Sequence, residues 1–297
     1  MRDEEGVGRR RLTSSTSLAR RRTPWKCQSC SGMLLDPASA AADPALALVR
    51  DVYPADLLVP ISHARPRQPG EKPFVTLTYA QSLDGKIAGK GGKQLLLSGQ
   101  ESMTLTHRLR QLHDSILVGV GTVINDDPQL TARIPHLLPK KDQPLPIILD
   151  SSLRIPTTAK LLSNARKGIG KGPLVVCSAI RGAEPYLKCQ AIKETGGTVF
   201  LAEASGRRID LHKFLHEEVA TPYLGRSLMV EGGASVISSF LATPGLVDLV
   251  IVTVAPVLVG DEGVSVTKEG VDLPQLEHVR TQVFGKDTVF VCKPVYT

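Results

Sequence analysis

Residues 115–120 are Ser-Ile-Leu-Val-Gly-Val, a nearly continuous apolar run. Such a run, without alternating polar residues, is typical of a strand that is buried on both faces of a parallel sheet. Similar runs stand at residues 145–149 (LPIIL) and 173–179 (PLVVCSA). These stretches therefore predict a sheet whose central strands are covered on both sides.

Helical patterns lie between the apolar runs. Residues 98–114 place leucine and methionine at roughly helical spacing, which predicts a helix directly before the first of these strands. Further helices are expected at 183–192, 210–219 and 234–241, and further strands at 73–80, 197–202, 228–230 and 246–254. This alternation predicts an α/β fold with a mostly parallel sheet and helices on both faces. No helical pattern separates residues 247–254 from residues 288–293, so we expect antiparallel C-terminal strands.

The positive charge of the chain is concentrated at its start. The 297 residues carry a net charge of +7, and residues 1–26, with eight basic and three acidic side chains, supply +5 of it. A segment so poor in large apolar residues cannot offset its ordering entropy by burial. We therefore expect residues 1–72 to be a basic, disordered extension and linker, and residues 73–297 to be one domain. Within the linker, Asp43 and Pro44 predict the start of one short helix, while packing of residues 31–72 on the domain stays open.

The rest of the chain is nearly neutral, which argues against nucleic acid as a partner. A nucleic-acid-binding protein that uses the Arg-rich start is the alternative from another functional class. No apolar run has the length of a membrane-spanning helix, so no membrane partner is expected. We expect a cytoplasmic protein, and import into an organelle through the basic start is a disfavoured alternative because residues 3–5 are acidic.

The cysteines predict neither a disulfide framework nor a metal site. Their number is odd, and only Cys27 and Cys30 have the spacing of a zinc knuckle. A structural zinc site needs about four ligands, and no second pair of this kind occurs in the sequence. We therefore expect no metal.

Polar residues and glycines follow several predicted strands at the point where a ligand binds in such sheets, beyond the carboxyl ends. The stretches are Asp84-Gly85, Gly119 to Asp127, Asp150 to Ser152, and Glu231 to Val236. In the last of these, a strand enters a helix through Gly232 and Gly233, and the free N–H groups of a helix start suit a phosphate. Turns and helix caps are the structural alternative for each stretch.

Together these stretches resemble a known family. The following stretches occur in this order: TLTYAQSLDGKIA (76–88), SGQ (98–100) with H-x-L-R (107–110) in the helix that follows, ILVGVGTVINDDPQLTAR (116–133), IILDS (147–151), VEGGASVISSFL (230–241) and LVDLVIVTVAPVLVG (246–260). The set resembles the reductase of riboflavin biosynthesis, in particular its stand-alone fungal form. The resemblance implies a dihydrofolate-reductase-like fold and a homodimer. It also implies reduction, by NADPH, of the ribosyl group of 2,5-diamino-6-ribosylamino-4(3H)-pyrimidinone 5′-phosphate to ribitylamino.

The resemblance also implies roles for individual residues. NADPH would contact Ala80, Thr122, Asp126, Ser151, Gly232, Gly233, Ala234, Ser235 and Val236. The phosphorylated pyrimidine-ribose substrate would contact Arg110, Leu130, Arg133 and Glu231. Arginine suits the substrate phosphate because its planar fork matches the phosphate oxygens.

Three questions stay open at this point. Asp84 or a bound water is the candidate proton donor, and the sequence does not identify the catalytic acid. Arg181 is a candidate for the 2′-phosphate of NADPH, with a solvated surface arginine as the alternative. The deaminated substrate, 5-amino-6-(5-phosphoribosylamino)uracil, is the rival to the diamino pyrimidine.

Overall fold

A computed structural model describes residues 43–59, 67–68, 70–133, 136–180, 183–205, 208–267 and 270–296. The expected disorder of residues 1–26, the pair Cys27 and Cys30, and the candidate Arg181 lie outside the described residues. The boundary after residue 72 stays a prediction.

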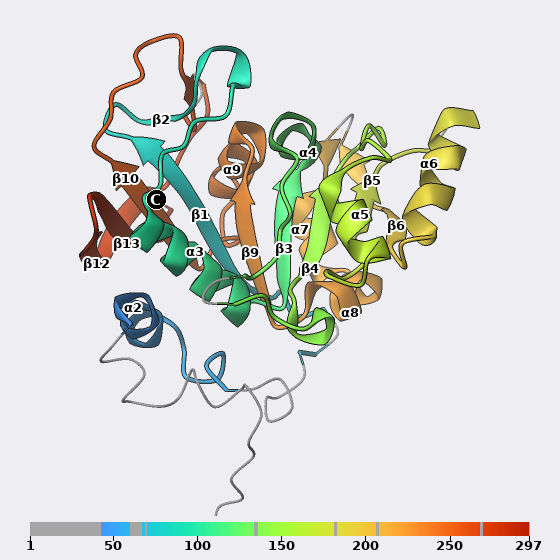
Figure 1. Cartoon of the computed structure of the whole chain (residues 1–297), viewed down its shortest axis with the longest axis horizontal. Helices are drawn as coiled ribbons and strands as arrows, with labels where there is room; N and C mark the ends of the chain where they lie inside the picture. Colours follow the sequence, from blue (N-terminus) through green and yellow to red (C-terminus); the bar gives the residue numbers. More distant parts are fainter. Residues whose placement is uncertain are drawn as a thin grey trace, which may run out of the picture.

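Among the described residues, nine strands form one sheet in the order β12-β13-β10-β1-β9-β3-β4-β5-β6 (Figure 1). They are β1 (Phe74–Ser82), β3 (Ser115–Gly119), β4 (Leu145–Leu149), β5 (Leu174–Cys177), β6 (Thr198–Leu201), β9 (Ser227–Gly232), β10 (Leu249–Ala255), β12 (Gln275–Phe284) and β13 (Asp287–Val295). The strands from β10 to β6 pair in parallel, whereas β13 is antiparallel to both β10 and β12. This confirms the mostly parallel sheet with antiparallel C-terminal strands.

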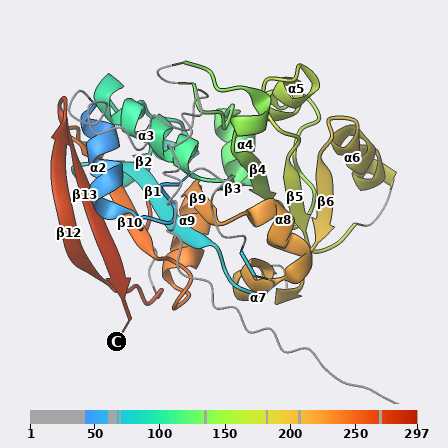
Figure 2. The same ribbon diagram turned by 90° about the horizontal axis from the view of Figure 1, so that it is seen from below.

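Helices cover both faces of the sheet, as expected (Figure 2). One face carries α2 (Pro44–Val52), α3 (Gln100–Leu112), α4 (Val120–Asp126), α5 (Lys160–Arg166) and α6 (Ala183–Lys193); the other carries α7 (Leu211–His216), α8 (Thr221–Leu224) and α9 (Ala234–Leu241). Alternate residues of the strands fill two separate apolar cores, as the pleat of a strand requires. In β3, for example, Ile116 and Val118 belong to one core and Leu117 to the other.

The short N-terminal helix forms as expected and packs on the domain. The Asp43 carboxylate accepts hydrogen bonds from the N–H groups of Ala45 and Leu46, which caps α2. Leu48 and Val49 of this helix are fully buried in the core under α3. The expectation of a disordered extension is therefore wrong for residues 43–59, which are part of the packed body because α2 buries its apolar face in the core.

A buried chain of hydrogen bonds ties this segment to the sheet and to α3. The Tyr53 hydroxyl lies 2.9 Å from the Thr76 hydroxyl, which lies 2.9 Å from Nε2 of His113. Nδ1 of His113 donates to the Leu109 carbonyl at 2.7 Å, because a carbonyl can only accept. Burial lowers the pKa of His113 to about 4, so the ring is neutral and Nε2 accepts from Thr76. Each side-chain polar group in this series of hydrogen bonds thus has a partner.

The structure contains elements that the sequence analysis did not expect, among them α4, β12 and α5. No helix was expected between Gly119 and Asp126, but β3 passes directly into α4 at Val120. The strand β12 was not expected, because its residues from Gln275 to Thr281 are all exposed and show no apolar alternation. The helix α5 is only seven residues long and too short for a clear period.

The strand order places the site. The chain passes from β1 through α3 to β3, and β9 is inserted later between these two strands. The helices that follow β1 and β3, α3 and α4, lie on one face of the sheet, whereas α9, which follows β9, lies on the other. In such sheets a ligand binds beyond the carboxyl ends of the strands, where the connections diverge to opposite faces.

Candidate active site

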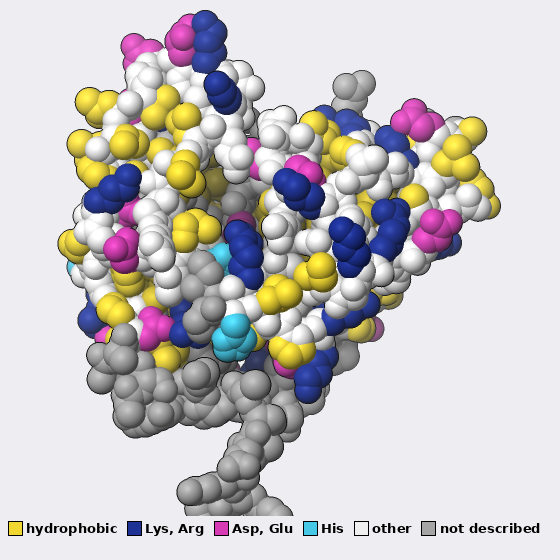
Figure 3. Space-filling view, viewed as in Figure 1, with side chains coloured by type: hydrophobic (Ala, Val, Ile, Leu, Met, Phe, Trp, Pro, Cys, Tyr) yellow, Lys and Arg dark blue, Asp and Glu magenta, His cyan; other side chains and the backbone are white. Residues whose placement is uncertain are grey.

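The residues that the resemblance assigned to the cofactor lie along one edge of the sheet. Ala80 is near the end of β1, Gly232 ends β9, Thr122 lies in the helix after β3, and Ser151 follows β4. These four strands are direct neighbours in the order β1-β9-β3-β4. The face seen in Figure 3 is hollowed beside this edge, above α3, and basic and histidine side chains lie at the side of the hollow.

A buried ion pair lies at the centre of the site. Nε and Nη2 of Arg110 donate to the two carboxylate oxygens of Glu231, each at 2.6 Å. The two side chains are 10% and 11% exposed. The third donor of the guanidinium, Nη1, reaches the carbonyl of Thr131 at 3.1 Å. Arg110 therefore joins α3, β9 and the loop after α4.

This pairing changes the roles expected for the two residues. The sequence suggested Arg110 as a phosphate ligand and Glu231 as an independent acceptor for the substrate. In the structure both carboxylate oxygens of Glu231 accept from Arg110, whose remaining nitrogen donates to the Thr131 carbonyl, so the two charges neutralise each other. A bidentate arginine–carboxylate pair is rigid and directional, and here it supports the surface that a ligand would contact.

Arg133 is the exposed cation of this group. It lies in the loop after α4, close enough to Arg110 for the charge of Arg110 to influence its pKa. Partial burial lowers the pKa of Arg133, and the charge of Arg110 adds to this, while Glu231 acts in the opposite direction. Because Glu231 is bound to Arg110, Arg133 is the one of these two arginines whose guanidinium can bind an anionic ligand.

Leu130, expected as a substrate contact, has a buried side chain. It is 1% exposed and part of the core beneath α3. Its φ of 52° lies in the left-handed region, which is unusual for leucine. Any contact from Leu130 to a substrate would therefore come from its backbone.

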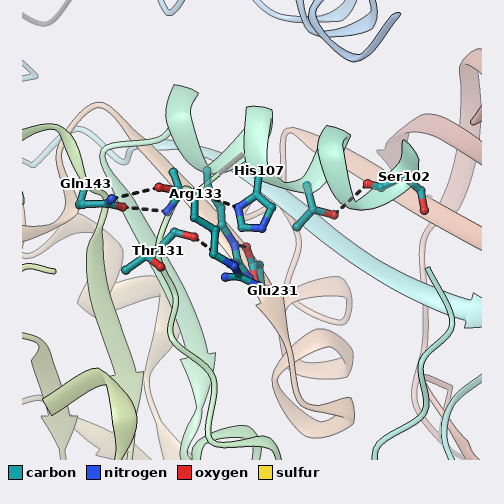
Figure 4. Close-up of polar contacts among 9 residues, drawn as sticks. Ser102, His107, Thr131, Arg133, Gln143 and Glu231 are labelled. Carbon is teal, nitrogen blue, oxygen red and sulfur yellow. Dashed lines mark hydrogen bonds and ion pairs between the residues drawn. The ribbon is translucent and has the colours of Figure 1, made fainter. Parts of the chain in front are cut away.

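His107 was not among the site residues that the sequence analysis expected. Its Nδ1 accepts a hydrogen bond from the backbone N–H of Arg133 at 3.3 Å (Figure 4). Burial lowers the pKa of His107 to about 3, with further lowering by Arg110 and Arg133, against a raising influence of the Thr131 carbonyl. The signal available in the sequence was its position one helical turn before Arg110.

The glycine turn before α9 has the geometry expected for close approach of a ligand. Gly232 and Gly233 have φ values of 143° and 84°. A Cβ on Gly233 would lie 3.2 Å from the Thr122 hydroxyl, and one on Gly119 would lie 2.8 Å from a methyl group of Val236. No side chain caps the start of α9, and the N–H of Val236 donates to the Gly233 carbonyl at 2.8 Å. The structure thus places Thr122 close to residues 233–236.

Of the three acidic residues at this edge, Asp127 and Asp150 hold backbone segments in place and Asp126 is half-buried. Asp127 accepts from the N–H of Lys160 at 2.7 Å and so anchors the start of α5. Asp126 is half-buried, which raises its pKa. Asp150 is fully buried, and one of its oxygens accepts from the N–H of Ile155 at 2.8 Å, which orders the loop that carries Ser151.

Asp84 does not have the environment of a proton donor. Its carboxylate accepts from the Ser82 hydroxyl at 2.5 Å and from the N–H of Gly260 at 2.7 Å. These two hydrogen bonds, with one from Val259, lower the pKa of Asp84 to about 2. The group is ionised at neutral pH and holds two loops together, which conflicts with the expected role.

Neither a group of metal ligands nor a membrane-spanning helix occurs in the part of the chain that the structure describes. No three His, Cys, Asp or Glu side chains within these ranges are grouped as metal ligands. None of the helices described is both long and apolar enough to cross a membrane.

The chain is similar to proteins of one family. The family model described as the RibD C-terminal domain matches residues 73–290. The 2,5-diamino-6-ribosylamino-4(3H)-pyrimidinone 5′-phosphate reductase of Candida glabrata is 35% identical over 203 residues, which are 66% of this chain and 80% of that protein. The reductase of the same name from Eremothecium gossypii is 36% identical over 232 residues, 76% of this chain and 89% of its own.

Solved structures agree with this. RibD of Acinetobacter baumannii has a TM-score of 0.62 at 25% identity, over 76% of this chain and 59% of the bacterial one. The riboflavin biosynthesis reductase Rib7 of Saccharomyces cerevisiae has a TM-score of 0.59 at 27% identity, over 78% of this chain and 93% of its own. The chain therefore belongs to the RibD C-terminal domain family, the reductases of riboflavin biosynthesis.

Proposed function

We propose that the protein uses NADPH to reduce the ribosyl group of 2,5-diamino-6-ribosylamino-4(3H)-pyrimidinone 5′-phosphate to the ribitylamino group. One observation carries the proposal. Two features suited to phosphate, the start of α9 and the exposed Arg133, lie at the same edge of the sheet and are linked through Glu231 in β9. Such an edge can hold two phosphate-bearing ligands side by side.

The residues fit a nicotinamide dinucleotide. The backbone of Gly232 and Gly233 and the uncapped start of α9 would hold its phosphates, where the helix dipole favours negative charge. Thr122 stands beside this turn. Ala80, Asp126 and Ser151, which lie near the carboxyl ends of the neighbouring strands β1, β3 and β4, would complete the contacts to the cofactor. NADPH, when bound, supplies the hydride.

The protein itself contributes to the reaction by positioning the two ligands and by excluding water. Arg133 would bind the 5′-phosphate of the substrate through charge-assisted hydrogen bonds. Arg110 and Glu231 stand behind it and keep the loop in place. The product has two more electrons and two more protons than the substrate. The hydride accounts for the electrons and one proton. The second proton, which a nitrogen or oxygen of the sugar takes up, comes from a group other than Asp84.

The direct test is to mix the purified full-length chain with NADPH and each candidate substrate. We expect the absorbance of NADPH to fall with the diamino pyrimidine and to fall much more slowly with the deaminated uracil compound. A faster reaction of the uracil compound would establish the rival substrate instead. No loss of NADPH with either compound would contradict the proposed function.

Changing Arg133 to Ala should weaken binding of the phosphorylated substrate. A charge-assisted hydrogen bond contributes about 1.5–3 kcal/mol, which corresponds to a rise in KM of roughly 10- to 150-fold. The affinity for NADPH, measured by fluorescence titration, should stay within about twofold. An unchanged KM would show that Arg133 does not contact the phosphate.

We also propose that the protein is a homodimer that uses the outer face of β12 and β13. Val283 and Phe290 lie on one face of these strands and are 64% and 38% exposed. β12 is also a ten-residue edge strand, and such edges are usually covered. A second copy of the chain is the occupant that the family resemblance suggests.

Light scattering can test the dimer. The wild type should have the molar mass of a dimer, and Val283→Glu should shift it to a monomer. Leu201→Glu, which places the same charge on the opposite edge strand, should stay dimeric. A monomeric wild type, or a dimer that survives Val283→Glu, would contradict the proposal.

A further inference from the structure

Residues 131–133, here called the clamped segment, are held by three side chains. The carbonyl of Thr131 accepts from Arg110 at 3.1 Å. The N–H of Ala132 donates to Gln143 at 2.8 Å, and its carbonyl accepts from the same amide at 3.0 Å. The N–H of Arg133 donates to His107 at 3.3 Å. Figure 4 shows these contacts together around the Glu231 carboxylate.

The clamp is needed because the segment begins next to a strained residue. Leu130, directly before it, has its backbone in the left-handed region. Such a conformation persists only where the surroundings fix it from several sides. The side chains of Gln143 and His107 are 1% and 0% exposed, so water does not compete with the hydrogen bonds they make.

His107 destabilises the fold in one respect, because it buries a polar N–H group. Its Nδ1 is an acceptor, so the proton of the neutral ring sits on Nε2. This buried Nε2 makes no hydrogen bond of ordinary geometry with the residues that the structure describes, although the Thr131 carbonyl lies near enough to raise the pKa of the ring. The neighbouring buried positions of α3 hold Leu105 and Leu109, and an apolar residue at 107 would avoid the unpaired donor.

We propose that His107 is a positioning residue for recognition of the substrate phosphate. Its neutral Nδ1 fixes the backbone of Arg133, and this aims the guanidinium at the 5′-phosphate. A charged ring would face Arg110 and Arg133, so a neutral acceptor is the form that the site can hold. The inference rests on the proposed function, and in particular on the role of Arg133.

Two substitutions separate this role from a packing role. His107→Asn keeps an acceptor near the position of Nδ1, whereas His107→Gln moves its acceptor to about the position of Nε2. The measurement is the phosphate preference, the ratio of kcat/KM for the 5′-phosphorylated substrate to that for the dephosphorylated one. We expect the preference to fall about tenfold in His107→Gln, through KM, and to stay within about threefold of the wild type in His107→Asn.

His113→Leu serves as the matched control, because His113 is a second buried histidine at the end of α3 that does not contact the clamped segment. It should lower Tm and leave the phosphate preference unchanged. If His107→Gln keeps the preference, or His107→Asn loses as much as His107→Gln, the inference is wrong. If these variants keep the preference while Arg133→Ala loses it, the inference fails and the phosphate contact stands. If Arg133→Ala also keeps it, the phosphate contact itself is wrong, and the NADPH assay decides separately on the reductase.

Discussion

The pair of Arg110 and Glu231 is the interaction on which the substrate end of the site depends. It joins residues 121 positions apart in the sequence, one in α3 and one in β9. Two charges that are almost completely buried are stable only with close to ideal geometry, because each loses its hydration. Here both carboxylate oxygens and three guanidinium nitrogens are used, the last on the Thr131 carbonyl. The pair therefore fixes a helix, a strand and a loop relative to one another.

The insertion of β9 between β1 and β3 explains why the two ends of the site are coupled. Glu231 and the glycines that precede α9 are consecutive in the chain. The residue that anchors the substrate end thus lies next to the turn that we propose for the cofactor phosphates. A shift of β9 would move both ends together, which suits a reaction that requires two ligands to meet face to face.

The fold could be predicted from the sequence to the extent that burial leaves a pattern. Both faces of β3 and β4 are covered, and their unbroken apolar runs show this directly. The helix α2 could be placed because Asp43 and Pro44 are a cap and a first-turn residue. β12 could not be found, because a strand with no buried face has no reason to alternate.

The candidate site was predictable as a set of residues but not as a set of interactions. The ordered motifs brought Thr122, Gly233, Arg110 and Glu231 into one list. That Arg110 and Glu231 neutralise each other follows only from the distance between α3 and β9, which the sequence does not contain. His107 was missed for the same reason, since its partner is a backbone N–H in a distant loop. Asp84 was suggested as an acid because its hydrogen bonds from another loop were unknown.

The most direct measurement is a double-mutant cycle on the pair, with Arg110→Met and Glu231→Gln and the free energy of unfolding as the observable. Removing one partner of a buried pair leaves the other charge uncompensated, and each single substitution should cost about 3–5 kcal/mol. The double substitution removes both charges, so its cost should be smaller than the sum by at least about 1 kcal/mol. Costs that simply add, or single substitutions below about 1 kcal/mol, would show that the pair does not hold the site together.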